Sequence, residues 1–268
     1  MNPDPNQTEM TQLEEGLSAQ SALLLVVAVL AGAMLALLLA PLFAPSLSTS
    51  LVGAQPKGFW YLSRASGVIA FVLLWASTAF GILISNKMAR TWPGGPRAFE
   101  LHEHSSLLAV GLSLFHGAIL LGDRFIHASL GQILLPFGVS QYRPIWVGLG
   151  QISFYLLVIV TASFYVRKRI GHRVWRGLHY ASFVIFLMAL LHGFSSGTDA
   201  STPLVRDIYW LSGGIVLFLT LYRILAPAHK PKKALRTPAP SAGVGQKPRR
   251  KALPVPVPVP EIRPVPRR

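Results

Sequence analysis

LHEHSSLLAVGLSLFHG (residues 101–117) is one of the two most informative stretches of this chain. The other is LHYASFVIFLMALLHG (residues 178–193). Each places a histidine near both ends of an apolar run. His102 and His116 are 14 residues apart, and His179 and His192 are 13 apart. At about 1.5 Å per residue, helices of this kind cross most of a bilayer. Ionisable side chains are costly there, so four imidazoles in two such runs indicate a functional role.

The composition is that of a membrane protein. Apolar residues make up 51% of the chain and charged residues only 13%, against about 25% charged residues in an average soluble domain. The mean hydropathy is +0.47. Apolar runs of spanning length cover residues 22–44, 60–84, 99–121, 145–166, 174–194 and 208–225. We therefore predict an all-α, polytopic membrane helix bundle with six transmembrane helices.

The same pattern divides the chain into four segments. Residues 1–20 are polar, residues 21–45 form an extra transmembrane helix, and residues 58–226 carry the other five spans. Residues 227–268 combine 11 of the 25 Lys and Arg residues with a Pro-Val repeat, which predicts a disordered, basic, Pro-rich tail. No aromatic residue interleaves these basic residues, so we expect no binding to nucleic acid. The absence of cysteine excludes thiolate-bound iron–sulfur clusters and c-type haem attachment.

Positive charges between the spans predict the orientation. The loops that join spans two and three, and spans four and five, contain Lys87, Arg90, Arg97, Arg167, Lys168, Arg169, Arg173 and Arg176. Because positively charged loops stay in the cytoplasm, these loops and the tail are expected there. Both termini of this multi-pass cell-membrane protein are then cytoplasmic. The first span disagrees locally, since no Lys or Arg precedes it.

With this orientation, spans three and five cross the membrane in the same direction. His102 and His179 then share a depth near the cytoplasm, and His116 and His192 share a depth near the outer side. A neutral imidazole is a good axial ligand for haem iron. We therefore expect each pair to hold one haem, with the two haems stacked across the bilayer, as in helix bundles that bind cofactors between facing helices. The alternative for each histidine is a buried, hydrogen-bonded imidazole without a ligand.

The angular spacing leaves alternatives open. At about 100° per residue, 14 residues return to within about 40° of the same helix face, whereas 13 residues miss it by about 140°. Span five must therefore tilt, twist or contain an irregularity such as a π-bulge, unless one assignment is wrong. His104, two residues after His102, is the second candidate for the ligand near the cytoplasm.

Other residues near the histidines fit a haem site. Arg176, about one turn before His179, and Arg64 are candidates to pair with haem propionates, although either could instead reach toward the interface. Small residues that would leave room for a flat ring, or that would serve helix packing, are Gly67, Gly111, Gly117 and Gly193.

Residues 58–226 resemble the ferric-reductase-like transmembrane family, which includes ferric reductases, the membrane domain of NADPH oxidases and the haem-binding subunit of the methionine sulfoxide reductase system. The resemblance rests on YLSRASG from Tyr61, YRPIW from Tyr142, WRGLHY from Trp175 and the spacing of the four histidines. It implies two b-type haems with bis-histidine ligation. It also implies electron entry on the cytoplasmic side and exit on the outer side, and some relatives draw on membrane quinol.

The departures from the family limit what this chain is expected to do alone. Ferric reductases and NADPH oxidases continue into FAD- and NADPH-binding domains, and no such sequence is recognised here. Gly243-Val244-Gly245 has neither a strand before it nor a helix after it, so it is not a dinucleotide site. We expect a transmembrane b-type cytochrome that depends on a separate flavoprotein or quinol as donor and on an outer-side acceptor. Flavin would enter only through the partner.

Two other functions remain open. A haem-free transporter could use the histidines as a proton relay or as a metal site, although it would be expected to carry carboxylates within the spans, and Glu100 and Glu103 lie only at the end of span three. A haem-free scaffold could present the basic tail. The sequence does not distinguish ferric iron, oxygen, a quinone or an oxidoreductase as the final acceptor.

Overall fold

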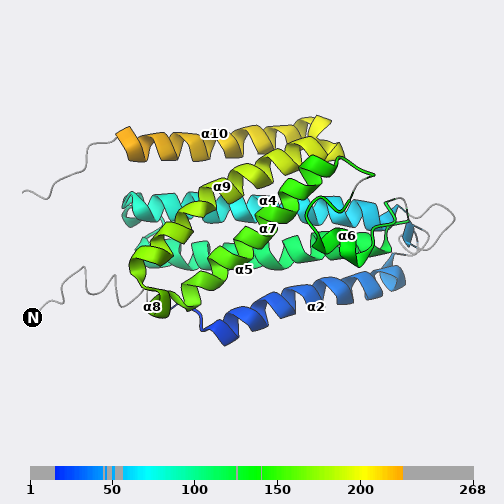
Figure 1. Cartoon of the computed structure of the whole chain (residues 1–268), viewed down its shortest axis with the longest axis horizontal. Helices are drawn as coiled ribbons and strands as arrows, with labels where there is room; N and C mark the ends of the chain where they lie inside the picture. Colours follow the sequence, from blue (N-terminus) through cyan, green and yellow to red (C-terminus); the bar gives the residue numbers. More distant parts are fainter. Residues whose placement is uncertain are drawn as a thin grey trace, which may run out of the picture. The chain divides into compact units, whose positions relative to one another are not determined.

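The chain is built from helices, without a strand, in the part that the computed structural model describes: residues 16–44, 46, 50–51, 57–124, 126–139 and 141–225. Within it, six helices are long and apolar enough to cross a membrane (Figure 1). They are α2 (Ala19–Phe43), α4 (Gly58–Ser85), α5 (Gly95–Ala118), α7 (Pro144–Tyr165), α9 (His172–Ser196) and α10 (Pro203–Leu225). The predicted all-α fold with six spans is confirmed. Most of the predicted segment 1–20 and the whole predicted tail 227–268 lie outside the described residues.

Short helices lie in the connections. They are η1 (Met88–Arg90), η2 (Ile119–Gly122), α6 (Leu130–Leu134), α8 (Arg167–Ile170) and η3 (Thr198–Ser201). From the sequence these segments were predicted only as loops or span ends. They are too short, or too polar, to give a hydropathy signal of their own.

Proline explains where three of the long helices begin. Pro144 and Pro203 are the first residues of α7 and α10, and Pro96 is the second residue of α5. A proline suits the first turn of a helix because the N–H that it lacks would have no partner there. α5 and α10 consequently begin four and five residues before the predicted spans, because their first residues are polar and lower the hydropathy.

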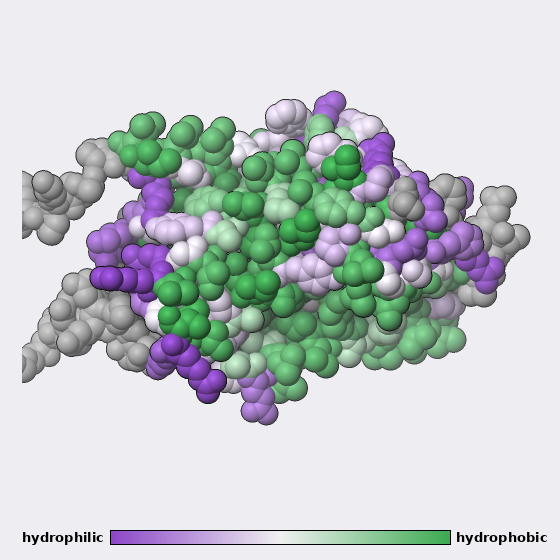
Figure 2. Space-filling model, viewed as in Figure 1, coloured by the Kyte–Doolittle hydropathy of each residue, from purple (hydrophilic) through white to green (hydrophobic). Residues whose placement is uncertain are grey.

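Apolar side chains cover the outside of the long helices. Phe218 is 64% exposed, Leu187 53% and Ile159 52%. Figure 2 shows apolar residues over the middle of the helices, with hydrophilic residues gathered toward their ends. A water-soluble protein does not leave apolar surface of this extent uncovered. The arrangement is that of a multi-pass membrane protein, in which lipid covers these side chains.

α4 is at the centre of the helix packing. It packs most extensively against α5 and also contacts α9 and α10. Leu74 of α4, Ala109 of α5 and Ile185 of α9 are buried in one apolar cluster, which α7 completes. Small and hydroxylated residues at these contacts let the backbones approach closely, as is usual between membrane helices.

α2 packs on α5 (Figure 1). A Cβ atom at Gly111 would lie 3.0 Å from Cγ1 of Val29, so glycine is what lets the two helices come this close. Near the start of α2, the carboxylate of Glu103 accepts the backbone N–H of Leu17 at 3.0 and 3.2 Å. The extra helix predicted at 21–45 is therefore packed on the bundle, and Gly111 serves helix packing there.

Gln151 of α7 makes three of the hydrogen bonds that tie the segment between α5 and α7 to the bundle. Gln151 of α7 donates from Nε2 to the carbonyls of Gln132 and Ile133, both at 2.8 Å. Its Oε1 accepts the N–H of Phe137 at 3.0 Å. α6 begins with a capping box in which Ser129 and Gln132 bond each other's backbone. These bonds give partners to backbone groups of this connection that its short helix does not pair.

We expect Gln151→Leu to loosen residues 129–139, because the change removes the partner of two carbonyls and one N–H. An unsatisfied buried group costs about 1–3 kcal/mol. Amide hydrogen exchange should become faster in this segment. Thr220→Val is the control, since the Thr220 hydroxyl bonds the Val216 carbonyl of its own helix. Equal protection in Gln151→Leu and the control would contradict the assignment.

Candidate functional site

The four histidines meet in two pairs. The ring centroids of His102 and His179 are 5.9 Å apart, and those of His116 and His192 are 6.1 Å apart. Each pair joins α5 to α9, and in each the ring planes are close to perpendicular, at 70° and 77°. The structure thus brings together the two pairs that the spacing predicts, at two levels of the bundle.

Tilt explains how the 13-residue spacing on α9 is accommodated. α9 is a continuous α-helix from His172 to Ser196, without a π-bulge. Figure 1 shows α9 running obliquely to α4 and α5, which are nearly parallel to each other. Because α9 runs obliquely to α5, His179 and His192 can each face a histidine of α5 although they do not lie on one face of α9.

The separation within each pair suits two ligands of one metal ion. A metal–imidazole distance of about 2.0 Å, with about 1.1 Å from the nitrogen to the ring centre, puts two ring centres about 6 Å apart across the ion. Among the described residues no third His, Cys, Asp or Glu joins either pair. A metal ion here would need its other ligands from elsewhere. A porphyrin supplies four ligands in one plane, so the residues present fit haem.

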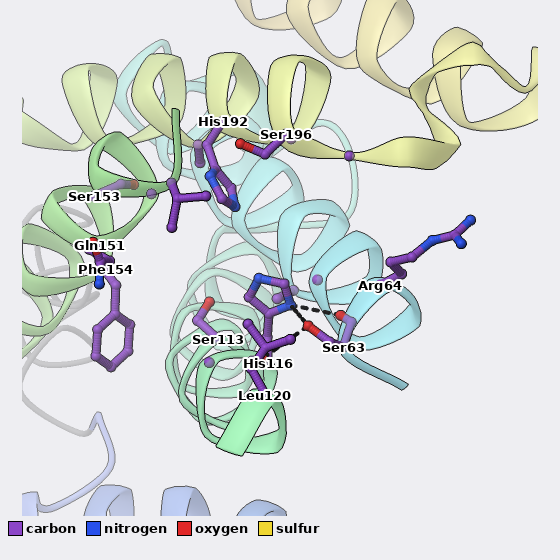
Figure 3. A pocket seen from close by; sticks show the side chains of 18 of the residues that line it. Ser63, Arg64, Ser113, His116, Leu120, Gln151, Ser153, Phe154, His192 and Ser196 are labelled. Atoms are coloured by element: carbon purple, nitrogen blue, oxygen red, sulfur yellow. Dashed lines mark hydrogen bonds between the residues drawn. The ribbon is translucent and has the colours of Figure 1, made fainter. Parts of the chain in front are cut away.

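A cavity of about 310 Å³ surrounds the His116–His192 pair. It is within the size range of cofactor and ligand sites. Figure 3 shows His116 of α5 and His192 of α9 pointing toward one another, with Ser196 beside them. The Ser196 hydroxyl is buried, lines the cavity and has no hydrogen-bond partner among the described residues. It is therefore available to a polar group of a bound ligand.

Three of the four imidazoles donate to a backbone carbonyl through Nδ1. His116 donates to Ser63 at 2.7 Å, His102 to Ser77 at 2.8 Å and His192 to Trp146 at 2.8 Å. A carbonyl only accepts, so the proton is on Nδ1 and the lone pair of Nε2 is free. A neutral imidazole prepared in this way is a metal ligand.

His179 is placed differently. It makes no hydrogen bond to a described residue, and its ring lies against the Trp175 indole, with centroids 5.3 Å apart and planes 31° apart. On its other side, Trp175 contacts His172, with centroids 5.4 Å apart. The His102–His179 pair therefore has one imidazole held by a carbonyl and one packed on an aromatic ring.

The two predicted arginines are in different settings. Arg64 forms an ion pair with Asp199 of η3, in which its Nε donates to Oδ2 at 2.6 Å. Figure 3 shows its side chain directed away from the two imidazoles. A propionate near Arg64 would have to share it with Asp199. Arg176 is exposed on α9, three residues before His179, and its pairing with a propionate stays a prediction.

The positions of His104 and of the candidate glycines show which of them lie at the histidine pairs. His104 is exposed on α5 and bonds the Glu100 carbonyl of its own helix, so His102 and not His104 faces His179. Gly67 lies against the His116 ring, whereas Gly193 makes room for Tyr209 and Gly111 for α2.

From the sequence, Gly67 of α4 was predicted as a small residue near the site, but the contacts of Ser63, Ser77 and Gly81 with the histidines were missed. A signal for them was nevertheless present. Residues 63–67 (SRASG) and 77–81 (STAFG) repeat Ser-x-Ala-x-Gly at a spacing of 14. His102 and His116 have the same spacing on the neighbouring helix. A search for repeats would have indicated that α4 serves both sites in the same way. No comparable pattern in the sequence indicated that Asp199 pairs with Arg64.

Comparison with known proteins gives no match to a family model, a curated protein or a solved structure.

Asp199→Asn should destabilise the protein by about 1 kcal/mol or more, because it leaves the guanidinium of Arg64 without its counter-charge in a site where both side chains are only about a quarter exposed. Asp207→Asn is the matched control, because its pair with Arg206 is more than half exposed and should change stability by less than about 0.5 kcal/mol. Thermal unfolding of the purified variants measures both. Equal effects would argue against a structural role of the Arg64–Asp199 pair.

Proposed function

We propose that this protein is a transmembrane b-type cytochrome, with one haem held between His102 and His179 and another between His116 and His192. The observation that carries the proposal is the facing of two imidazoles, about 6 Å apart, at each of two levels. It agrees with the resemblance of residues 58–226 to the ferric-reductase-like transmembrane family.

The chain's own residues would ligate and orient the haems. Carbonyls of α4 and α7 keep protons on Nδ1 of three histidines, which would leave Nε2 free to ligate the iron. Apolar helices exclude water around each site. Haem would supply a centre that gains and loses one electron without covalent change to the protein.

The two levels define a route for electrons. Fourteen residues of helix rise about 20 Å, so the pairs lie at two depths of the bilayer. By the distribution of positive charge, the His102–His179 pair is on the cytoplasmic side and the His116–His192 pair on the outer side. Electrons would enter from a separate flavoprotein or from quinol and would leave to an acceptor on the outer side. Arg64 and Arg176 remain candidates for the propionates.

The first test is a reduced-minus-oxidised spectrum of the purified protein from haem-supplemented cells. We expect a Soret band, a reduced α-band and about two haems per chain, because each histidine pair holds one. Haem is quantified as its pyridine haemochrome against protein mass. Colourless material would refute the proposal and favour a haem-free transporter or scaffold.

The second test removes one ligand at a time. His116→Ala should lose the haem of the outer pair and keep the other, and His102→Ala should do the reverse, because each haem loses one of two axial ligands. Redox titration separates the two haems. His104→Ala is the matched control, since this exposed side chain is two residues from His102 and should leave both haems in place. Loss of a single haem in His104→Ala would overturn the ligand assignment.

A further inference from the structure

One arrangement of atoms occurs three times around the histidines. In each case a helical carbonyl accepts a hydrogen bond from the Nδ1–H of an imidazole. The residue four positions after the one that bears this carbonyl is glycine. The three sets are Ser63 with Gly67 at His116, Ser77 with Gly81 at His102, and Trp146 with Gly150 at His192. Two sets are on α4 and one is on α7, so the arrangement is not a property of a single helix.

The geometry of the α-helix explains the spacing of four. The carbonyl of a helical residue already accepts the N–H four residues later, which leaves one lone pair directed sideways. A helical side chain points toward the N-terminus and covers the turn before its own Cα. A side chain four residues later therefore covers this lone pair. Glycine has no side chain, so it leaves the lone pair accessible to the imidazole.

The distances at the three glycines agree with this explanation. A Cβ atom at Gly67 would lie 2.8 Å from Nδ1 of His116, and one at Gly150 would lie 2.5 Å from Nδ1 of His192. At Gly81 the nearest atom is Cε1 of His102, at 3.3 Å. Alanine at Gly67 or Gly150 would collide with the ring, and alanine at Gly81 would press on it.

Both serines add a second contact. The Ser63 hydroxyl donates to the backbone carbonyl of His116 at 3.1 Å, and the Ser77 hydroxyl to that of His102 at 3.3 Å. Each serine therefore accepts a hydrogen bond from the imidazole ring through its carbonyl and donates one to the same histidine's backbone through its hydroxyl. Figure 3 shows this for Ser63 and His116. These reciprocal bonds fix the ring relative to its own helix.

We propose that these three carbonyl–glycine sets are positioning sites, which hold the proton on Nδ1 and aim Nε2 of His116, His102 and His192 at the partner imidazole. The placement of the proton stands without any cofactor, whereas the aiming of a haem ligand rests on the proposed function. Both imidazoles of the His116–His192 pair are held in this way. In the other pair only His102 is held, and His179 is placed by Trp175.

The test replaces each glycine by alanine in the full-length protein. Gly67→Ala and Gly150→Ala should change the midpoint potential and the low-spin electron paramagnetic resonance signal of the outer haem only. Gly81→Ala should change those of the other haem only. Loss of such a supporting bond lowers metal affinity by about 10–100-fold, so haem loss from the affected site to apomyoglobin should accelerate over a comparable range.

Two other helical glycines provide matched controls. A Cβ atom at Gly32 of α2 or at Gly214 of α10 would meet no atom of the rest of the protein within 4 Å. Alanine there should leave both haem signals as in the wild type and slightly favour the helix. The proposal is overturned if the three test variants behave like these controls, or if each of them alters both haems equally.

A second variant tests the proposal if Gly67→Ala does not fold. If Gly67→Ala does not accumulate, Ser63→Ala removes only the hydroxyl contact and should shift the outer haem signal by a smaller amount. Ser63→Thr, which restores a hydroxyl, should reverse the shift. An unchanged signal in Ser63→Ala, together with wild-type behaviour of Gly150→Ala, would overturn the proposal.

The ¹⁵N resonances of the histidines test the positioning proposal independently of the proposed function. If the wild-type protein contains no haem, the proposed function fails. A ¹⁵N-histidine spectrum of the same sample then tests the positioning alone. Three imidazoles with the proton on Nδ1, and loss of that pattern for His116 in Gly67→Ala, would support it. Protons on Nε2 of His102, His116 and His192 would overturn it.

Discussion

An imidazole inside a membrane bundle must have both of its ring nitrogens satisfied, because lipid offers no water to do so. This constraint organises α4, α5, α7 and α9. For three of the four paired histidines, Nδ1 is satisfied by a backbone carbonyl of a neighbouring helix. In the His116–His192 pair both rings carry their proton on Nδ1, so neither Nε2 can receive a hydrogen bond from the other ring's Nε2. A metal ion shared by the two rings, as proposed above, would give both Nε2 atoms a partner at once.

The helix packing follows from the same requirement. A ring can reach a helical carbonyl only where the two backbones come close, and this is where Gly67, Gly81 and Gly150 are found. The extensive contact between α4 and α5, with its buried serines, holds the rings at that distance. Substitutions that enlarge these residues would therefore affect helix packing and histidine orientation together.

The sequence predicted the six spans because their apolar runs have spanning length. It predicted the pairing of the four histidines because spans three and five cross in the same direction, which places the histidines at two matched depths. It misplaced the starts of α5 and α10, where Pro96 and Pro203 extend the helix into polar sequence. It left the 13-residue spacing unexplained, since tilt of α9 is a property of the whole bundle. The pairing of Arg64 with Asp199, 135 residues apart, depends on the loop after α9 and had no local signal.

The docking of α2 also limits how this protein assembles. α2 occupies the side of α5 that carries Gly111, where a smooth, small-residue surface would otherwise attract another helix. A neighbouring subunit therefore cannot use that surface of α5 without first displacing α2. Any association between protomers that used the Gly111 side of α5 would therefore have to compete with a helix of the same chain.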